Sequence, residues 1–112
     1  LSELGSLIKN FVRGSDVVCR FGGDEFAYLL PFTSSDEAKV FAERIKKIVS
    51  KYEFLKGGIE KRVNLTMSTG IATFPEHGQT AEEIISKADQ ALFASKSGGR
   101  NRITIYERGG II

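Results

Sequence analysis

The chain has 112 residues, a formal net charge of +2 and 27% charged residues, a composition that indicates one globular domain with an ordinary polar surface. A domain of this length buries roughly 65% of the surface that its unfolded chain exposes, which suffices for a core without disulfides. The mild charge argues against a protein that binds nucleic acid through bulk electrostatics, so any anion site must be local.

The sequence also bears on the compartment. Cys19 is the only cysteine, and this excludes an intrachain disulfide. Neither an apolar run of about 18 residues nor a basic-then-apolar leader occurs in the sequence. We therefore expect a reduced, cytoplasmic domain, while the sequence leaves open whether the whole protein is anchored to a membrane.

The first residues have the apolar spacing of a helix. Apolar side chains recur at helical intervals from Leu1 to Val12 without a capping residue before them, so we expect the domain to begin upstream of this sequence. Gly14 then supplies a stop signal, and a strand is predicted from Asp16.

A glycine pair separates two β-rich runs, residues 16–21 and 26–30. This pattern predicts a hairpin that turns at Gly22 and Gly23 and carries the following two carboxylates at its tip. Adjacent carboxylates repel unless a proton or cation intervenes, and clustered oxygen donors suit Mg²⁺. The alternative is a solvated turn with ordinary polar flanks, which turn chemistry alone favours.

A long helix is predicted after the hairpin. Ser34 and Glu37 have the spacing of a capping box that opens it. A solvated face carries Lys39, Glu43, Lys46 and Lys47, with Arg44 beside the core stripe. The residues expected to form that stripe are Ala38, Phe41, Ile45, Ile48 and Tyr52.

The middle of the chain is less regular. Composition does not decide between a loop and a small hairpin for residues 54–62. Residues 63–74 alternate apolar and small polar side chains and predict a strand, in which Gly70 indicates a bulge or close packing. His77 lies in a turn without a partner histidine or cysteine and is predicted to be a surface residue.

The last part of the chain predicts a helix and a strand. Thr80 and Glu83 repeat the capping-box spacing, the helix ends at Gly98 and Gly99, and residues 102–106 form the strand. The side chains expected to face inward are Ile84, Ile85, Ala88, Ala91, Leu92 and Ser95. The whole chain, residues 1–112, therefore predicts one α+β domain with helices packed on a mostly antiparallel sheet. Compared with a βαββαβ scheme, it lacks the first strand.

The sequence contains RFGGDEF at residues 20–26, TMSTGIA at residues 66–72 and ADQALFASKSGGRN at residues 88–101. Together these segments resemble the GGDEF family of diguanylate cyclases. Residues 20–26, RFGGDEF, match the family signature, and residues 88–101, ADQALFASKSGGRN, resemble its closing segment AD-x-AL-Y-x-AK-x-x-GRN. Residues 66–72, TMSTGIA, resemble its strand T-V-S-I-G-V-A. The three matches occur in the family's order, and they imply a ferredoxin-like, nucleotidyl-cyclase-type fold for this chain.

The resemblance implies a transferase that condenses two GTP molecules into the bacterial second messenger cyclic di-GMP, each of two facing protomers holding one GTP. It implies that Gly22 and Gly23 approach the nucleotide, that Asp24 binds Mg²⁺, and that Asp24 and Glu25 are catalytic. The sequence does not decide which carboxylate acts as the base.

The resemblance also implies two sites of positive charge. Lys96 and Arg100 would bind the GTP phosphates, and they would share a helix face if helical order continued to residue 100. Cations near a helix C-terminus are also favoured by the helix dipole without any ligand. Arg13 and Asp16 match the family's R-x-x-D inhibitory site for cyclic di-GMP, which Arg44 would complete across a dimer.

One family segment has no counterpart among these residues. It is the upstream D-x-D-x-F-K-x-x-N-D strand and loop, which supplies a second metal-binding Asp and the groups that recognise guanine. Two Mg²⁺ ions per site are expected, with the second carboxylate ligand outside this chain. We therefore expect these residues alone to be inactive, and the sheet to be rearranged or to accept a strand from a neighbour.

Two other functions are compatible with the sequence. A catalytically silent GGDEF domain would act as a cyclic di-GMP or GTP receptor. A ferredoxin-like module would bind RNA through Phe26 and Tyr28, although no RNP-like run occurs and we expect no nucleic-acid partner. Family members usually follow a sensory domain and transmit its signal, so an upstream sensor is an expected partner.

Overall fold

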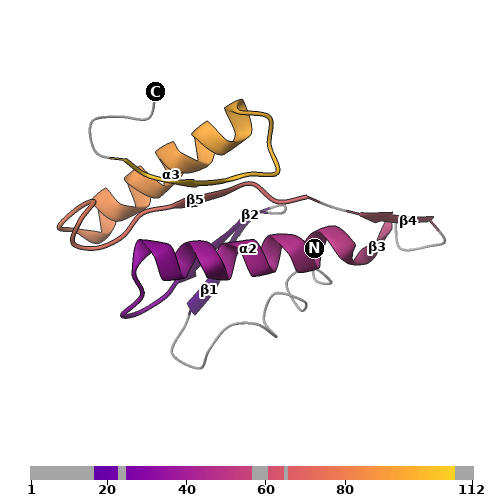
Figure 1. Cartoon of the computed structure of the whole chain (residues 1–112), viewed down its shortest axis with the longest axis horizontal. Coiled ribbons are helices and arrows are strands. Elements are labelled where there is room, and N and C mark those ends of the chain that lie inside the picture. The colour runs from indigo at the N-terminus through magenta and orange to yellow at the C-terminus, as the bar shows by residue number, and fades with distance from the viewer. Residues whose placement is uncertain (1–16, 23–24, 57–60, 65, 108–112) are drawn as a thin grey trace.

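The computed structural model describes residues 17–22, 25–56, 61–64 and 66–107. They form three strand pairs and two long helices (Figure 1). The elements in chain order are β1 (Val17–Gly22), β2 (Glu25–Leu29), α2 (Ser35–Lys51), β3 (Glu53–Lys56), β4 (Lys61–Asn64), β5 (Thr69–Ile71), α3 (Ala81–Ser97) and β6 (Ile103–Ile105). The helix predicted before residue 13 lies outside the described residues.

Strands β1 and β2 form the antiparallel hairpin that the sequence predicts. Their register runs from Val17 opposite Leu29 to Gly22 opposite Glu25, with an irregularity after Arg20. The sequence predicted a turn at Gly22 and Gly23. Gly22 instead belongs to β1, so residues 23 and 24 connect the two strands.

Helix α2 begins with the predicted capping box. The Ser34 hydroxyl accepts a hydrogen bond from the Glu37 amide, and the Glu37 carboxylate accepts one from the Ser34 amide. The predicted core stripe is only partly correct, because the buried side chains of α2 are Ala42, Ile45 and Val49, whereas Tyr52 is exposed. The buried face follows the contact of α2 with β5 and β6, which the periodicity of the helix alone does not locate.

The chain between the helices changes partners. Strands β3 and β4 pair in antiparallel fashion, which agrees with the small hairpin, one of the two structures that the composition left open for residues 54–62. The single strand predicted for residues 63–74 is wrong, because Val63 pairs with Phe54 in this hairpin. Farther along, β5 pairs in parallel with β6, with Thr69 opposite Ile103.

Helix α3 closes the β5–α3–β6 unit. Its capping box, Thr80 with Glu83, is confirmed, and the two backbone amides that the Glu83 carboxylate accepts from, Gln79 and Thr80, lower the pKa of that carboxyl. Ala91 and Ser95 are fully buried against β5 and β6, while Ile85 is 54% exposed, contrary to the prediction. Adjacent residues lie about 100° apart around a helix, so Ile84 and Ile85 do not both face the sheet.

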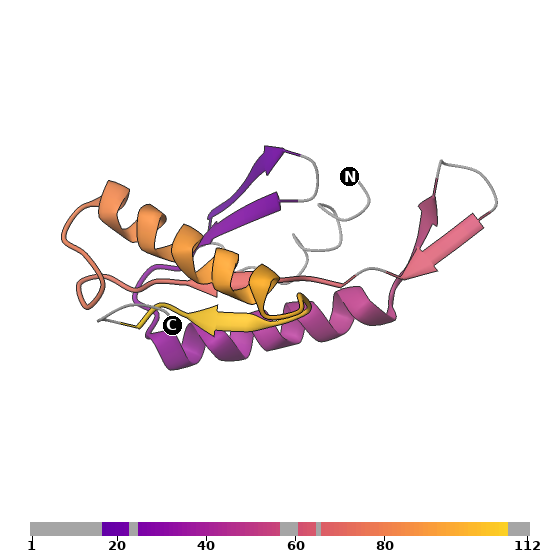
Figure 2. The ribbon, with the colours of Figure 1, turned by 90° about the horizontal axis from the view of Figure 1, so that it is seen from above.

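Gly70 marks the contact between β5 and α3. A Cβ atom at this position would clash with the backbone nitrogen of Leu92 and the backbone oxygen of Ala88. The close packing that the sequence suggested is therefore present. Figures 1 and 2 show α3 lying along β5, with α2 on the other side of that strand.

Within the described residues the sheet is divided into three pairs, β1–β2, β3–β4 and β5–β6, of which two are antiparallel. Helices packed on short strands confirm the predicted α+β class. No helix in the described part of the chain is long and apolar enough to cross a membrane.

Candidate functional site

The tip of the β1–β2 hairpin is the first part of the predicted site. Strand pairing places the backbones of Gly22 and Glu25 opposite each other, so that Gly23 and Asp24 connect them. Gly23 and Asp24 themselves lie outside the described residues, as do Arg13 and Asp16. The side-chain roles of Asp24 and Glu25 therefore stay predictions.

The hairpin tip carries oxygen donors that suit a magnesium ion. Carboxylate oxygens are the protein ligands that Mg²⁺ prefers, and Asp24 and Glu25 supply such oxygens in adjacent positions. Elsewhere, the residues described by the structure contain no group of three or more His, Cys, Asp or Glu side chains that could hold a metal ion. The residue types of the hairpin tip thus fit the ion.

The C-terminal end of α3 is the second part of the predicted site. The helix ends at Ser97, and the amide of Arg100 donates to the carbonyl of Ser95 at 3.0 Å while the amide of Gly99 donates to that of Lys96 at 3.4 Å. These two bonds are those of a Schellman motif, with Gly99 at the left-handed position. Its φ of 114° requires glycine or strains any other residue.

This motif changes the expected relation between Lys96 and Arg100. Lys96 lies in the last helical turn, but Arg100 has a φ of 65° and follows the reversal, so helical order does not continue to it. The two residues therefore do not share a helix face. Instead, the backbone of Arg100 is held against the last turn of α3, and its side chain is exposed.

The reversal is tied to the start of β5. The amide of Asn101 donates to the Ser68 hydroxyl at 3.1 Å, and the amide of Thr69 donates to the carbonyl of Arg102 at 2.8 Å. The Arg102 guanidinium lies over Gly98, close enough for its Nη1 to come within 2.9 Å of a Cβ added there. Sequence reasoning missed Arg102, whose position next to the Arg-Asn pair was the only available signal.

A buried hydroxyl lies inside this turn. Ser95 is 0% exposed, its hydroxyl donates to the carbonyl of Thr69 at 2.8 Å, and it contacts the Thr104 hydroxyl at 2.7 Å. The sequence placed Ser95 correctly on the inward face but gave no indication of its partners, because both lie on strands and not on the helix that carries Ser95.

Two other predicted residues, Arg44 and Tyr28, lie on or against α2. Arg44 is exposed on α2, which leaves its guanidinium accessible. The ring of Tyr28 packs edge-on against Phe41, with ring centroids 5.4 Å apart, so it faces α2 and does not form an open platform for bases. Burial raises the pKa of the Tyr28 phenol to about 12.

His77 is half-buried, which differs from the surface position predicted for it. Its Nδ1 accepts a hydrogen bond from the Thr73 amide at 2.8 Å, and its ring packs edge-on against Tyr106. Lys87 lies 4.8 Å above the Tyr106 ring. These contacts give His77 a structural role in holding the turn before α3.

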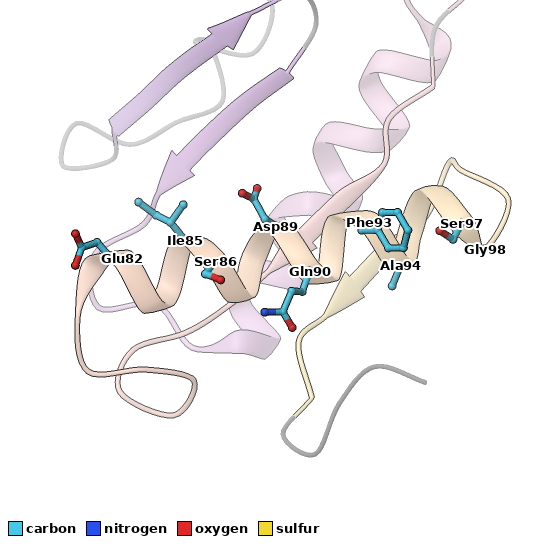
Figure 3. A pocket seen from close by; sticks show the side chains of 9 residues that line it. All are labelled: Glu82, Ile85, Ser86, Asp89, Gln90, Phe93, Ala94, Ser97 and Gly98. Carbon is cyan, nitrogen blue, oxygen red and sulfur yellow. The ribbon is translucent and has the colours of Figure 1, made fainter.

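An open groove of about 990 Å³ follows the outer face of α3 (Figure 3). Its described wall runs from Glu82 to Gly98 and includes two exposed apolar side chains, Ile85 and Phe93, with Asp89 between them. The groove ends at the helix turn that carries Lys96, but neither Lys96 nor Arg100 is part of this wall. It is therefore distinct from the predicted phosphate-binding residues.

Comparison with known proteins gives a consistent result. The family model described as "Diguanylate cyclase, GGDEF domain" matches residues 1–102. A probable diguanylate cyclase, DgcE, of Escherichia coli is 44% identical over 96% of this chain, and Diguanylate cyclase A of Treponema denticola is 38% identical over 94%. The chain spans only 10% and 28% of the lengths of these relatives.

Solved structures show the same similarity. The GGDEF domain of PA1120 (YfiN or TpbB) from Pseudomonas aeruginosa superposes with a TM-score of 0.83 and 33% identity, covering 96% of this chain and 66% of that one. The GGDEF domain of DgcB from Caulobacter crescentus, solved in complex with c-di-GMP, has a TM-score of 0.80 and 28% identity, with coverages of 92% and 60%.

Proposed function

Because this chain belongs to the diguanylate cyclase GGDEF family, we propose that the protein containing it condenses two GTP molecules into cyclic di-GMP. The observation that carries this proposal is the family match over residues 1–102, which includes the complete RFGGDEF hairpin and the turn that presents Lys96 and Arg100. Since the chain covers a small part of its relatives, the proposal concerns the whole protein.

In the proposed reaction, the 3′-hydroxyl oxygen of each GTP attacks the α-phosphorus of the other. Two phosphodiester bonds form, two bonds to pyrophosphate break, and each hydroxyl proton passes to a base. Phosphoryl transfer of this kind needs placement and charge stabilisation more than covalent help from the protein. Two facing protomers, each holding one GTP, would provide that placement.

The hairpin tip would bind the nucleotide and its metal. Gly22 and Gly23 lack side chains that would keep the phosphates from the backbone, and Asp24 would bind Mg²⁺. When bound, the ion would neutralise developing charge on the phosphates. Glu25, whose backbone pairs with Gly22, is placed next to Asp24 in the sequence to assist with the ion or with the hydroxyl proton.

Lys96 and Arg100 would hold the phosphates from the other side of the site. Their support is the Schellman turn, which keeps the backbone of Arg100 hydrogen-bonded to the helix turn that contains Lys96. An arginine fork and a lysine point charge together suit a triphosphate. The exposed side chain of Arg100 is accessible to such a ligand.

The activity is tested by incubating the complete protein with GTP and Mg²⁺ and separating the products by chromatography. We expect cyclic di-GMP from the wild type and a loss on the order of 100-fold for Asp24→Asn, because a charge that stabilises the transition state is removed. Asp36→Asn, the same change at an exposed position in the first turn of α2, is the matched control and should remain active. The 112 residues alone are predicted to form no product.

Product inhibition is a further part of the proposal. Arg13 and Asp16 would bind cyclic di-GMP together with Arg44 of the facing protomer, with the arginine forks directed at guanine or phosphate. Arg13→Ala should weaken cyclic di-GMP binding in a titration, while Lys39→Ala on the exposed face of α2 should not. Unchanged affinity of the Arg13 variant would contradict this site.

A receptor without catalytic activity is the second candidate. The structure of the DgcB GGDEF domain in complex with c-di-GMP favours ligand binding as a property to test in this chain as well. A complete protein that binds cyclic di-GMP or GTP but forms no product with Mg²⁺ would support this candidate over the enzyme.

A further inference from the structure

We propose that Ser95 is a positioning residue, whose buried hydroxyl fixes the last turn of α3 on β5 and β6 and so sets where Lys96 and Arg100 present their charges. This inference rests on the proposed phosphate-binding role of those two cations. It assigns to Ser95 a function beyond filling space in the core.

The hydrogen bonds of Ser95 form a chain with one direction. The Ser95 hydroxyl has a single proton, which it donates to the carbonyl oxygen of Thr69 at 2.8 Å. In the 2.7 Å contact with Thr104 the proton must therefore come from the Thr104 hydroxyl. The result is an ordered path from the Thr104 hydroxyl through the Ser95 hydroxyl to the Thr69 carbonyl.

This path joins the helix to both strands of the sheet beneath it. Thr69 begins β5, and Thr104 lies in β6 opposite Gly70. At Gly70 an added Cβ atom would clash with the backbone of α3, so the hydroxyl acts where the helix lies close to β5. Ser95 is 0% exposed, and water therefore does not substitute for either partner.

The backbone of Ser95 is used as well. Its carbonyl accepts the hydrogen bond from the Arg100 amide at 3.0 Å that closes the Schellman motif. Lys96 is the next residue in the helix. One residue thus holds the strands with its side chain and the Arg100 backbone with its carbonyl, and it carries Lys96 on the adjoining peptide bond.

Serine and alanine at this position differ by the hydroxyl group that makes the two hydrogen bonds. Alanine would fill the same small space without the two hydrogen bonds, so the serine is not needed for packing alone. Its partner Thr104 supplies the second hydroxyl of the pair.

The test measures the affinity of the complete protein for inorganic pyrophosphate with Mg²⁺, by titration calorimetry at a temperature well below unfolding. Ser95→Ala is expected to weaken binding about fivefold. Thr104→Val, which replaces the hydroxyl with a methyl group of similar size, should also weaken it. Thr104→Ser, which keeps the hydroxyl, should bind as the wild type does.

Two controls separate positioning from general stability and from the proposed function. Ile71→Val removes a buried methyl from β5 and should lower the melting temperature without changing the affinity. Equal weakening by Ile71→Val, or wild-type affinity in Ser95→Ala, would overturn the positioning role. Lys96→Ala and Arg100→Ala should both weaken binding, and if neither does, the phosphate-binding function itself is wrong.

Discussion

Gly99 shows how a single residue determines the geometry of the candidate site. It occupies the left-handed position of the Schellman motif, and the following two residues also have positive φ, 65° and 52°. Asparagine and glycine adopt such angles more readily than other residues, whereas Arg100 does so at a cost. The hydrogen bonds from the turn to Ser95 and Ser68 hold the backbone in this strained conformation.

Gly99→Ala is predicted to lower the free energy of unfolding by about 1–2 kcal/mol, because a Cβ is disfavoured at positive φ. The neighbouring change Gly98→Ala is the matched control. Its φ is −82°, and the nearest obstacle is the flexible end of Arg102, so a smaller loss is expected. Denaturant titration of both variants measures the difference, and equal losses would contradict the role assigned to the backbone angle.

Tyr28 links burial to alkaline stability. The folded protein holds the phenol proton more tightly than the unfolded chain, since burial raises the pKa from 10.0 to about 12. The contribution of the protonated phenol to the free energy of unfolding is therefore fully present below pH 10. It is lost as the pH rises toward 12, by up to about 1.4 kcal/mol per pH unit.

Tyr28→Phe should remove this alkaline dependence and leave stability at neutral pH unchanged or slightly higher. The reason is that, in the described part of the chain, the buried hydroxyl has no hydrogen-bond partner to lose. Tyr106→Phe keeps Tyr28 and should keep the slope that Tyr28 causes. Thermal unfolding between pH 9 and 12 measures the effect, and an unchanged slope in Tyr28→Phe would refute the assignment.

At the scale of the elements, the packing of α3 on β5 depends on Gly70. Gly70→Ala is predicted to destabilise the domain by about 1–3 kcal/mol, because the clash is with backbone atoms of Leu92 and Ala88 that cannot rotate away. Gly98→Ala is the comparison and should destabilise less, since the closest atom there is the flexible end of the Arg102 side chain. A melting temperature of Gly70→Ala equal to that of the wild type would mean that the helix is not held this closely.

Local sequence signals predicted some elements and not others. Both capping boxes and the hairpin formed as expected, because a cap or a short turn involves residues only a few positions apart. The split of residues 63–74 was not predictable in this way. Val63 pairs with Phe54, whereas Thr69 pairs with Ile103. The alternation of apolar and polar residues along one strand does not identify which strand it pairs with.

The same difference between local and distant contacts applies to the candidate site. Lys96 and Arg100 were identified from the resemblance, but their relation depends on the reversal at Gly99, which the helix spacing did not include. The hydrogen bond between the Ser95 and Thr104 hydroxyls was not predictable from the sequence. A small residue on an inward helix face gives the same sequence pattern whether its side chain is hydrogen-bonded or only packed. His77 was assigned to the surface because its Thr73 and Tyr106 contacts arise from tertiary structure.

For the whole molecule, the division into three strand pairs is the main structural feature. Strand β2 pairs with β1, and β5 pairs with β6. Helices α2 and α3 both contact the β5–β6 pair (Figure 2). The hairpin that carries Gly22 and Glu25 and the turn that carries Lys96 and Arg100 thus belong to different pairs. A nucleotide bound by both would connect these two parts of the fold.

We propose that the complete protein joins two GTP molecules, and the stoichiometry of its products tests this proposal most directly. After incubation with GTP and Mg²⁺, cyclic di-GMP is quantified by chromatography and pyrophosphate by an enzymatic assay in the same sample. We expect two pyrophosphates released for each cyclic di-GMP formed. GTP consumed to GDP and phosphate, or GTP left intact by the folded protein, would contradict it.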